Sequence, residues 1–216
     1  MSFWPEFLLI ATVHLMAVAS PGPDFAIVLR YAVRYGRQQA LAASLGIGVA
    51  ILLHVTWSLV GIAVLIQTTP WVFKALSFAA AVYLTYIGVQ ALQSKAPAHP
   101  EQAIAAGDND TVPSAKKAFI AGFITNGLNP KATLFFLSLF AVIISPVTPL
   151  SYKVIYGVYM AFATAAWFAF LSVILTREKV RAFLLRKGYW FDRLMGAVLL
   201  ALAMHLIYGA IQSQLH

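Results

Sequence analysis

The apolar residues of this chain fall into six long runs separated by short polar stretches. A helix needs about 20 mostly apolar residues to cross a membrane. The runs extend over about residues 3–30, 40–66, 71–92, 118–144, 154–176 and 191–211. This pattern predicts an all-α membrane protein with six transmembrane helices.

Two of the six runs contain residues that interrupt a helix. Residues 20–24 of the first run are Ser-Pro-Gly-Pro-Asp, and residues 126–131 of the fourth are Asn-Gly-Leu-Asn-Pro-Lys. Proline lacks an N–H and clashes with the preceding helical turn. In lipid such a break is tolerated only where protein or water satisfies the freed carbonyls. We therefore expect the first and fourth helices to be broken, an arrangement that in transporters marks the binding site.

The two halves of the chain have a matching plan. Each half has three runs, an odd number, so the second half is expected to insert upside down relative to the first. The second run carries the small residues Ala42, Gly46 and Ala50 at four-residue spacing, and the fifth carries Gly157, Ala161, Ala165 and Ala169. Such ladders let helices approach closely. We predict one transmembrane domain over 1–216, with inverted repeats at about 3–92 and 118–211 and a mobile cytoplasmic loop at about 94–117.

Composition and charge agree with a membrane location. The 216 residues are 61% hydrophobic and 10% charged, whereas soluble domains are about 45–50% apolar and about 25% charged. The net charge of +8 does not indicate nucleic-acid binding, because membrane topology alone concentrates basic residues. The three loops expected on one side hold 12 of the 15 Lys and Arg residues. The positive-inside rule then places these loops in the cytoplasm and both termini outside, in the periplasm.

The first interruption carries an acid where ionisable groups are costly. Asp24 lies ten residues before Arg34, roughly 15 Å along a helix and about half of a ~30 Å hydrocarbon core. One interpretation is a structural acid at the start of the new half-helix. The other is a group that faces an aqueous cavity and binds a cationic amine or a proton.

The second interruption carries a base. Lys131 follows Pro130 in a first helical turn, where the helix dipole disfavours a cation, so it needs a carboxylate partner. That partner is either Asp24, in a structural ion pair, or the carboxylate of a substrate. In the second case the substrate is a zwitterion, with its carboxylate on Lys131 and free amides and its amine on Asp24. The substrate-binding candidates are Ser20, Gly22, Pro23, Asp24, Asn126, Asn129, Pro130 and Lys131.

Three histidines lie within the runs, at His14, His54 and His205. None is spaced to share a metal with another His, Asp or Glu, so no metal or cofactor is expected. Each is either a hydrogen-bonded packing residue or a proton relay. The chain has no GxxxxGK[ST] motif for nucleotide binding, so coupling to an ion gradient, with the proton favoured, is expected. The proton-coupling candidates are Asp24, His14 and His205.

Taken together, the two motifs and the six runs resemble the LysE/RhtB amino-acid exporter family, closest to its threonine and homoserine exporters. The resemblance also covers Val13-His14, Gly88 and His205-Leu206-Ile207. It implies secondary active export of threonine-like or other neutral amino acids across the bacterial inner membrane, driven by the proton gradient, by a protein that is not an enzyme. The expected partners are the amino acid, protons and the bilayer, with a homo-oligomer left open. The alternatives are a superfamily exporter of a cation or other metabolite, and an intramembrane enzyme.

Overall fold

The computed structural model describes residues 3–20, 22–68, 88–95, 111–145 and 147–187, with scattered positions between 78 and 86 and between 189 and 204. Within these residues all regular secondary structure is helical, which confirms the predicted all-α class. The helices are α1 (Phe3–Ala19), α2 (Pro23–Arg34), α3 (Arg37–Thr68), α5 (Ala115–Gly127), α6 (Pro130–Val142), α7 (Leu150–Ile174) and α8 (Glu178–Lys187).

Among the described helices, two are long and apolar enough to cross a membrane alone. They are the 25-residue stretches Arg37–Gly61 of α3 and Leu150–Ile174, which is α7. A third span is formed if α1 and α2, which meet at an angle of 55°, are counted as one broken helix. The predicted third and sixth spans lie mostly outside the described residues. The six-helix inverted repeat, and the assignment of each interrupted pair to one membrane crossing, therefore stay predictions.

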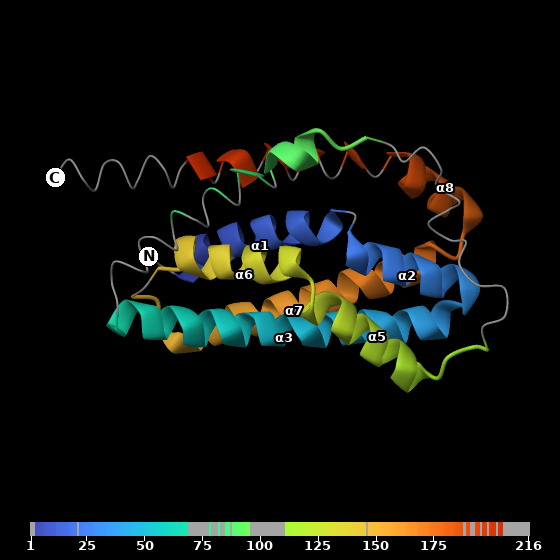
Figure 1. Cartoon of the computed structure of the whole chain (residues 1–216), viewed down its shortest axis with the longest axis horizontal. Coiled ribbons are helices and arrows are strands. Elements are labelled where there is room, and N and C mark those ends of the chain that lie inside the picture. Colours follow the sequence, from blue (N-terminus) through green and yellow to red (C-terminus); the bar gives the residue numbers. More distant parts are fainter. Residues whose placement is uncertain are drawn as a thin grey trace.

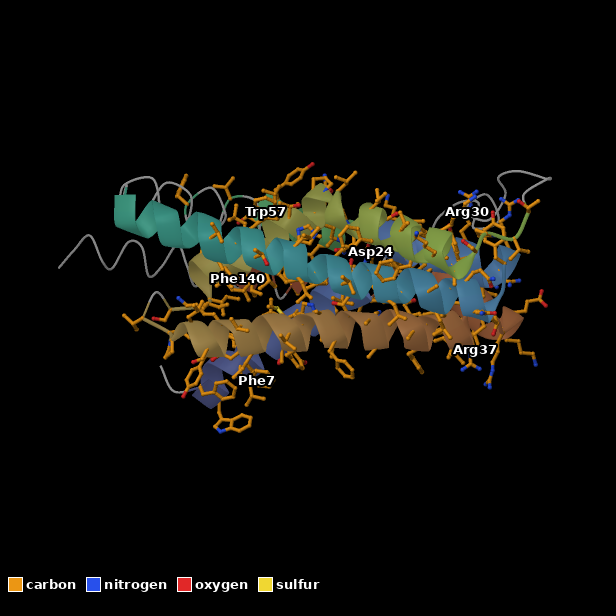
Figure 2. All side chains as sticks on the ribbon, turned by 90° about the horizontal axis from the view of Figure 1, so that it is seen from below. Phe7, Asp24, Arg30, Arg37, Trp57 and Phe140 are labelled. Atoms are coloured by element: carbon orange, nitrogen blue, oxygen red, sulfur yellow. The ribbon has the colours of Figure 1, made fainter. Side chains whose placement is uncertain are left out.

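Long helices and half-length helices lie side by side (Figure 1). The helices α3 and α7 run along the whole length of the molecule, while α1 and α6 occupy one half of that length and α2 and α5 the other. The interruptions at residues 20–22 and 128–129 thus fall near the middle of the long helices. In Figure 2, Asp24 lies between an end that bears Arg30 and Arg37 and an end that bears Phe7, Trp57 and Phe140.

Two glycines allow the backbones of α3 and α5 to lie in close contact. A Cβ on Gly46 would meet the Phe119 carbonyl oxygen of α5 at 2.0 Å, and one on Gly122 would meet the Ala43 oxygen at 2.1 Å. Neither position can carry a side chain unless the backbones separate. The predicted ladder on α7 also makes a close contact, because a Cβ on Gly48 of α3 would lie 2.5 Å from the Cβ of Ala165. Gly48 therefore faces α7, whereas Gly46 faces α5.

Two apolar clusters lie on either side of the midpoint. One joins α1, α3, α6 and α7 and includes Ile10, Ile51, Phe136, Phe140, Tyr156 and Met160. The other joins α2, α3 and α7 and includes Val28, Leu29, Ile47, Phe168 and Leu171. Polar residues are buried between them, among them His14, Ser20, His54, Asn126, Asn129 and Thr164. Buried polar groups need hydrogen-bond partners, and these partners form the site described next.

Candidate functional site

At the first interruption a new helix begins without a side-chain cap. The helix α1 ends at Ala19 and α2 begins at Pro23, with Gly22 as an extended N-cap residue (φ −166°). Because glycine has no side chain, the first-turn amides of Asp24 and Phe25 receive no side-chain cap, and they have no acceptor within the helix. Asp24 lies in this first turn, where the helix dipole favours an anion.

At the second interruption the new helix is capped. The helix α5 ends at Gly127 and α6 begins at Pro130, and the side-chain Oδ1 of Asn129 accepts a hydrogen bond from the backbone N–H of Lys131 at 3.0 Å. The Asn129 N–H in turn donates to the Asn126 carbonyl at 2.9 Å. This link satisfies one of the loose carbonyls at the end of α5 and fixes the course of the chain between the two helices.

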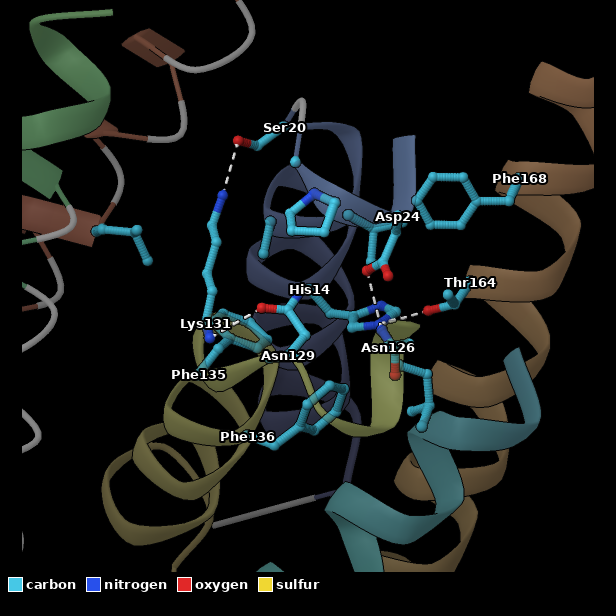
Figure 3. Close-up of a pocket in the computed structure, with 17 residues that line it drawn as sticks. His14, Ser20, Asp24, Asn126, Asn129, Lys131, Phe135, Phe136, Thr164 and Phe168 are labelled. Carbon is cyan, nitrogen blue, oxygen red and sulfur yellow. Dashed lines mark hydrogen bonds between the residues drawn. The ribbon is translucent and has the colours of Figure 1, made fainter. Parts of the chain in front are cut away.

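Side chains from the two interruptions are hydrogen-bonded to each other (Figure 3). The Asn126 Nδ2 donates to the Asp24 Oδ2 at 2.9 Å, and the Lys131 Nζ donates to the Ser20 Oγ at 3.2 Å. Within the described part of the chain no ion pair joins Asp24 to Lys131, although His54, Lys131 and Asn129 lie near enough to act on the Asp24 carboxylate. Of the two alternatives for Lys131, a structural ion pair with Asp24 or a substrate carboxylate, the first is therefore not formed in this structure; each side chain instead has the hydrogen bond given above.

His54 holds Asn126 in place from α3. Its Nε2 lies 3.0 Å from the Asn126 carbonyl oxygen, and its ring is stacked on Phe136 with centroids 5.6 Å apart. A carbonyl oxygen can only accept, so the His54 Nε2 carries the proton and donates. The backbone carbonyl of Asn126 is therefore fixed by α3, while its side chain reaches Asp24.

A cavity of about 70 Å³ lies where the interruptions meet. One ordered water needs about 10–15 Å³ of such space, so the cavity has room for several waters. Seven of the eight predicted substrate-binding residues line it, and Pro130, which opens α6, is not among them. The seven are Ser20, Gly22, Pro23, Asp24, Asn126, Asn129 and Lys131.

The other described residues that line the cavity include three aromatic residues and one histidine. His14, a predicted proton-coupling residue, lines the cavity with its Nε2 3.1 Å from the Thr164 Oγ1 of α7. Phe135, Phe136 and Phe168 also line it. The sequence analysis did not select Thr164, yet a signal existed: it is a polar residue one position from Ala165, in the small-residue ladder. His205 lies outside the described residues.

Three buried polar atoms of the cavity-lining residues have no hydrogen-bond partner within the described structure. They are the Asp24 Oδ1, the Asn126 Oδ1 and the His14 Nδ1. An unsatisfied buried polar atom costs about 1–3 kcal/mol. These three atoms lie around one cavity, where water or a ligand can supply the hydrogen bonds that the protein does not.

A second buried acid lies away from this cavity, and the sequence analysis missed it. Glu6 of α1 is 2% exposed and accepts hydrogen bonds from the Ser145 N–H at 2.8 Å, the Thr148 Oγ1 at 2.9 Å and the Tyr156 hydroxyl at 3.1 Å. All three partners are donors, so the carboxyl group joins α1 to the α6–α7 connection and to α7. In the sequence Glu6 is indistinguishable from an ordinary acid at the start of a helix.

Apolar helices long enough to span a bilayer, arranged around a buried polar cavity at interrupted helix ends, are typical of helical membrane proteins. The family model described as "LysE type translocator" matches residues 15–210. The chain belongs to this family, which confirms the resemblance drawn from the two motifs. It is therefore a transporter and not an enzyme, as predicted.

Curated relatives agree with the family assignment. The chain is 28% identical over 203 residues to a protein named threonine efflux protein from Salmonella typhimurium, covering 93% of this chain and 97% of the relative. It is 28% identical over 204 residues to the threonine efflux protein of Escherichia coli K12, with the same coverage. A leucine efflux protein from Enterobacter is 33% identical over 129 residues, covering 57% of this chain and 56% of the relative. No solved structure matches the chain.

Proposed function

We propose that this protein is a secondary active exporter of neutral amino acids, driven by the proton gradient, with both termini in the periplasm. The substrate is bound as a zwitterion in the cavity between the two interruptions. The observation that carries this proposal is the direct bonding of Asp24 to Asn126 and of Lys131 to Ser20, which brings one acid and one base to the same cavity.

The charges of the cavity suit a zwitterion. Asp24 is complementary to an α-ammonium group and Lys131 to an α-carboxylate. The open first-turn amides of α2 favour an anion, and the carboxyl-terminal end of α5 favours a cation. A neutral amino acid therefore adds no net charge to a buried site, whereas a free cation or anion would leave one group unpaired, at a high cost in low dielectric. The names of the threonine and leucine efflux relatives agree with this substrate class.

Asp24 is the group on which proton coupling depends in this proposal. Among the described residues it is the only Asp or Glu that lines the cavity, and a carboxyl group there can hold either the substrate amine or a proton. Competition between the two couples outward movement of the amino acid to inward movement of a proton. His14 lines the same cavity, and its hydrogen bond to Thr164 makes it a further candidate for the proton path.

The decisive measurement is efflux from reconstituted proteoliposomes. Vesicles are preloaded with labelled L-threonine, L-homoserine, L-leucine or L-lysine, the membrane potential is clamped, and the outside is made acidic. We expect faster efflux of one or more neutral amino acids than at equal pH, with the acceleration abolished by a protonophore. No pH-dependent movement of any amino acid, in vesicles that contain folded protein, would refute the proposal.

A further inference from the structure

Asp24 and Asn126 each use only one side-chain atom in the bond between them. The Asn126 atom in this bond is Nδ2, because only the amide nitrogen can donate to a carboxylate. The two atoms that remain, the Asp24 Oδ1 and the Asn126 Oδ1, are both acceptors. Both are buried and have no hydrogen-bond partner in the described part of the chain, so the pair has two unused acceptors at the cavity.

A third acceptor is available from α1. His14 is 1% exposed and lines the same cavity. Its Nε2 is 3.1 Å from the Thr164 Oγ1, and its Nδ1 has no hydrogen-bond partner among the described residues. When the proton of the neutral imidazole is on Nε2 and is donated to Thr164, Nδ1 is an acceptor.

The surroundings of these acceptors favour a cation. The Asp24 carboxylate supplies a negative charge, and α5 ends at Gly127, so the partial negative charge of its carboxyl-terminal end falls beside Asn126. The Lys131 Nζ donates to the Ser20 Oγ and not to the Asp24–Asn126 pair. The ligand group that fits is therefore a cation with several N–H donors on one small nitrogen.

We propose that the Asp24 Oδ1, the Asn126 Oδ1 and the His14 Nδ1 form a subsite for a primary ammonium group, each accepting one of its three N–H bonds. The transporter then selects substrates by the number of N–H donors on the amine. N-methylated amino acids, betaines and 2-hydroxy acids lack one or more donors and are disfavoured. This inference rests on the proposed function, since it concerns the amine end of the same zwitterion.

The first test needs no variant. In proteoliposomes, counterflow of labelled L-threonine and L-leucine is inhibited with the unlabelled amino acid and with its N-methyl, N,N-dimethyl and N,N,N-trimethyl derivatives. Each methyl group removes one donor and leaves one buried acceptor unpaired, so the inhibition constant is expected to rise about tenfold or more at each step. Equal inhibition constants for the amino acid and its three N-methylated derivatives would overturn the inference. The absence of any amino-acid counterflow would instead refute the proposed function itself.

The second test assigns the selectivity to residues. Asn126→Leu removes one acceptor at similar volume, and His14→Phe removes another. Each is expected to raise the KM for the primary amine and to reduce the discrimination against the N-methyl derivative about tenfold. The control is Ile124→Leu, on the exposed face of the same helix α5, which should leave the series unchanged. If correctly folded Asn126→Leu and His14→Phe still prefer the primary amine over its N-methyl derivative as strongly as the wild type does, neither residue belongs to the subsite.

Discussion

The two helix interruptions meet in one cavity but are built differently. At the first, Gly22 leaves the start of α2 uncapped and the first turn holds Asp24, an acid that the helix dipole stabilises. At the second, Asn129 caps α6 and the first turn holds Lys131, a base that the dipole disfavours. The first thus has an uncapped helix start and an unpartnered Asp24 oxygen, while the second has a capped helix start, although the Asn126 Oδ1 has no partner within the described structure.

This difference indicates that the two interruptions have different roles. The second interruption is fixed by bonds within itself, through Asn129 to Lys131 and to Asn126, and by His54 from α3. It provides a rigid frame that places a lysine and an amide at the cavity. The first interruption provides the exchangeable charge, because Asp24 retains an unpartnered oxygen within the described structure. Loss of the Asp24 charge at the first should therefore affect transport, whereas loss of the cap at the second should affect mainly stability.

The largest effect is expected for Asp24→Asn. The amide has nearly the same volume and its oxygen can still accept from Asn126, so folding should be preserved while the negative charge is lost. Truncating one partner of a buried charge pair costs about 2–5 kcal/mol of binding, which is about 30-fold or more in affinity. The rate of amino-acid efflux from proteoliposomes should fall by about 30-fold or more, and it should no longer respond to a pH gradient.

The control for Asp24→Asn is Thr12→Val on the exposed face of α1, which should transport normally. Thermal midpoints in detergent separate loss of transport from loss of folding. Wild-type, pH-dependent efflux in Asp24→Asn would show that Asp24 is only a structural acid of the first turn of α2.

Lys131→Met is expected to have the next largest effect. Hydrogen bonds to charged groups contribute about 1.5–3 kcal/mol, so the KM for the amino acid should rise about tenfold or more. Lys131→Arg, which keeps the charge, should recover part of this loss. Ser20→Ala, which removes the hydroxyl that accepts from the Lys131 Nζ, should raise the KM less than Lys131→Met does. If Lys131→Met lowers the thermal midpoint without changing the KM, the lysine belongs to the frame and not to the substrate site.

The sequence predicted the interruptions because their signal is local. Proline and glycine act on the backbone at their own positions, so the pattern placed the ends of α1 and α5 and the starts of α2 and α6 within a few residues. Asp24 and Lys131 were found for a related reason, since a charge inside an apolar run is rare. A partnership of Asp24 with the second break required the two breaks to face each other, and in the structure the Asn126–Asp24 bond joins them.

What the sequence did not predict depends on contacts between distant segments. The partner of Lys131 is Ser20 and not Asp24, which is decided by side-chain reach across the cavity. Glu6 is buried only because Ser145, Thr148 and Tyr156 lie around it, about 140–150 residues away in sequence. The bond between His14 and Thr164 is of the same kind. Such pairs leave no periodic signal, so one sequence alone cannot predict them.

Asn129→Ala tests the cap of the second interruption and should mainly reduce stability. Losing an Asn N-cap costs about 1 kcal/mol, within a range of about 0.5–2, because the Lys131 N–H loses its acceptor. We expect a lower thermal midpoint with pH-dependent efflux retained. Asn129→Ser, which keeps a capping oxygen, should restore most of the midpoint. A large loss of efflux in Asn129→Ala at an unchanged midpoint would show that Asn129 contacts the substrate directly.

Gly22→Ala is expected to have the smallest effect and tests the opposite feature, the uncapped start of α2. The nearest atom to an added Cβ is the Ser20 carbonyl oxygen at 4.0 Å, and the extended φ of −166° is open to any residue. The position also precedes a proline, which favours extended backbone. Stability should change by less than about 0.5 kcal/mol. Alanine cannot cap the helix either, so the Asp24 and Phe25 amides stay open and efflux should remain close to wild type. If efflux is instead lost at an unchanged thermal midpoint, the substrate carboxylate must approach the backbone at Gly22 more closely than a methyl group permits, and the glycine is required for binding.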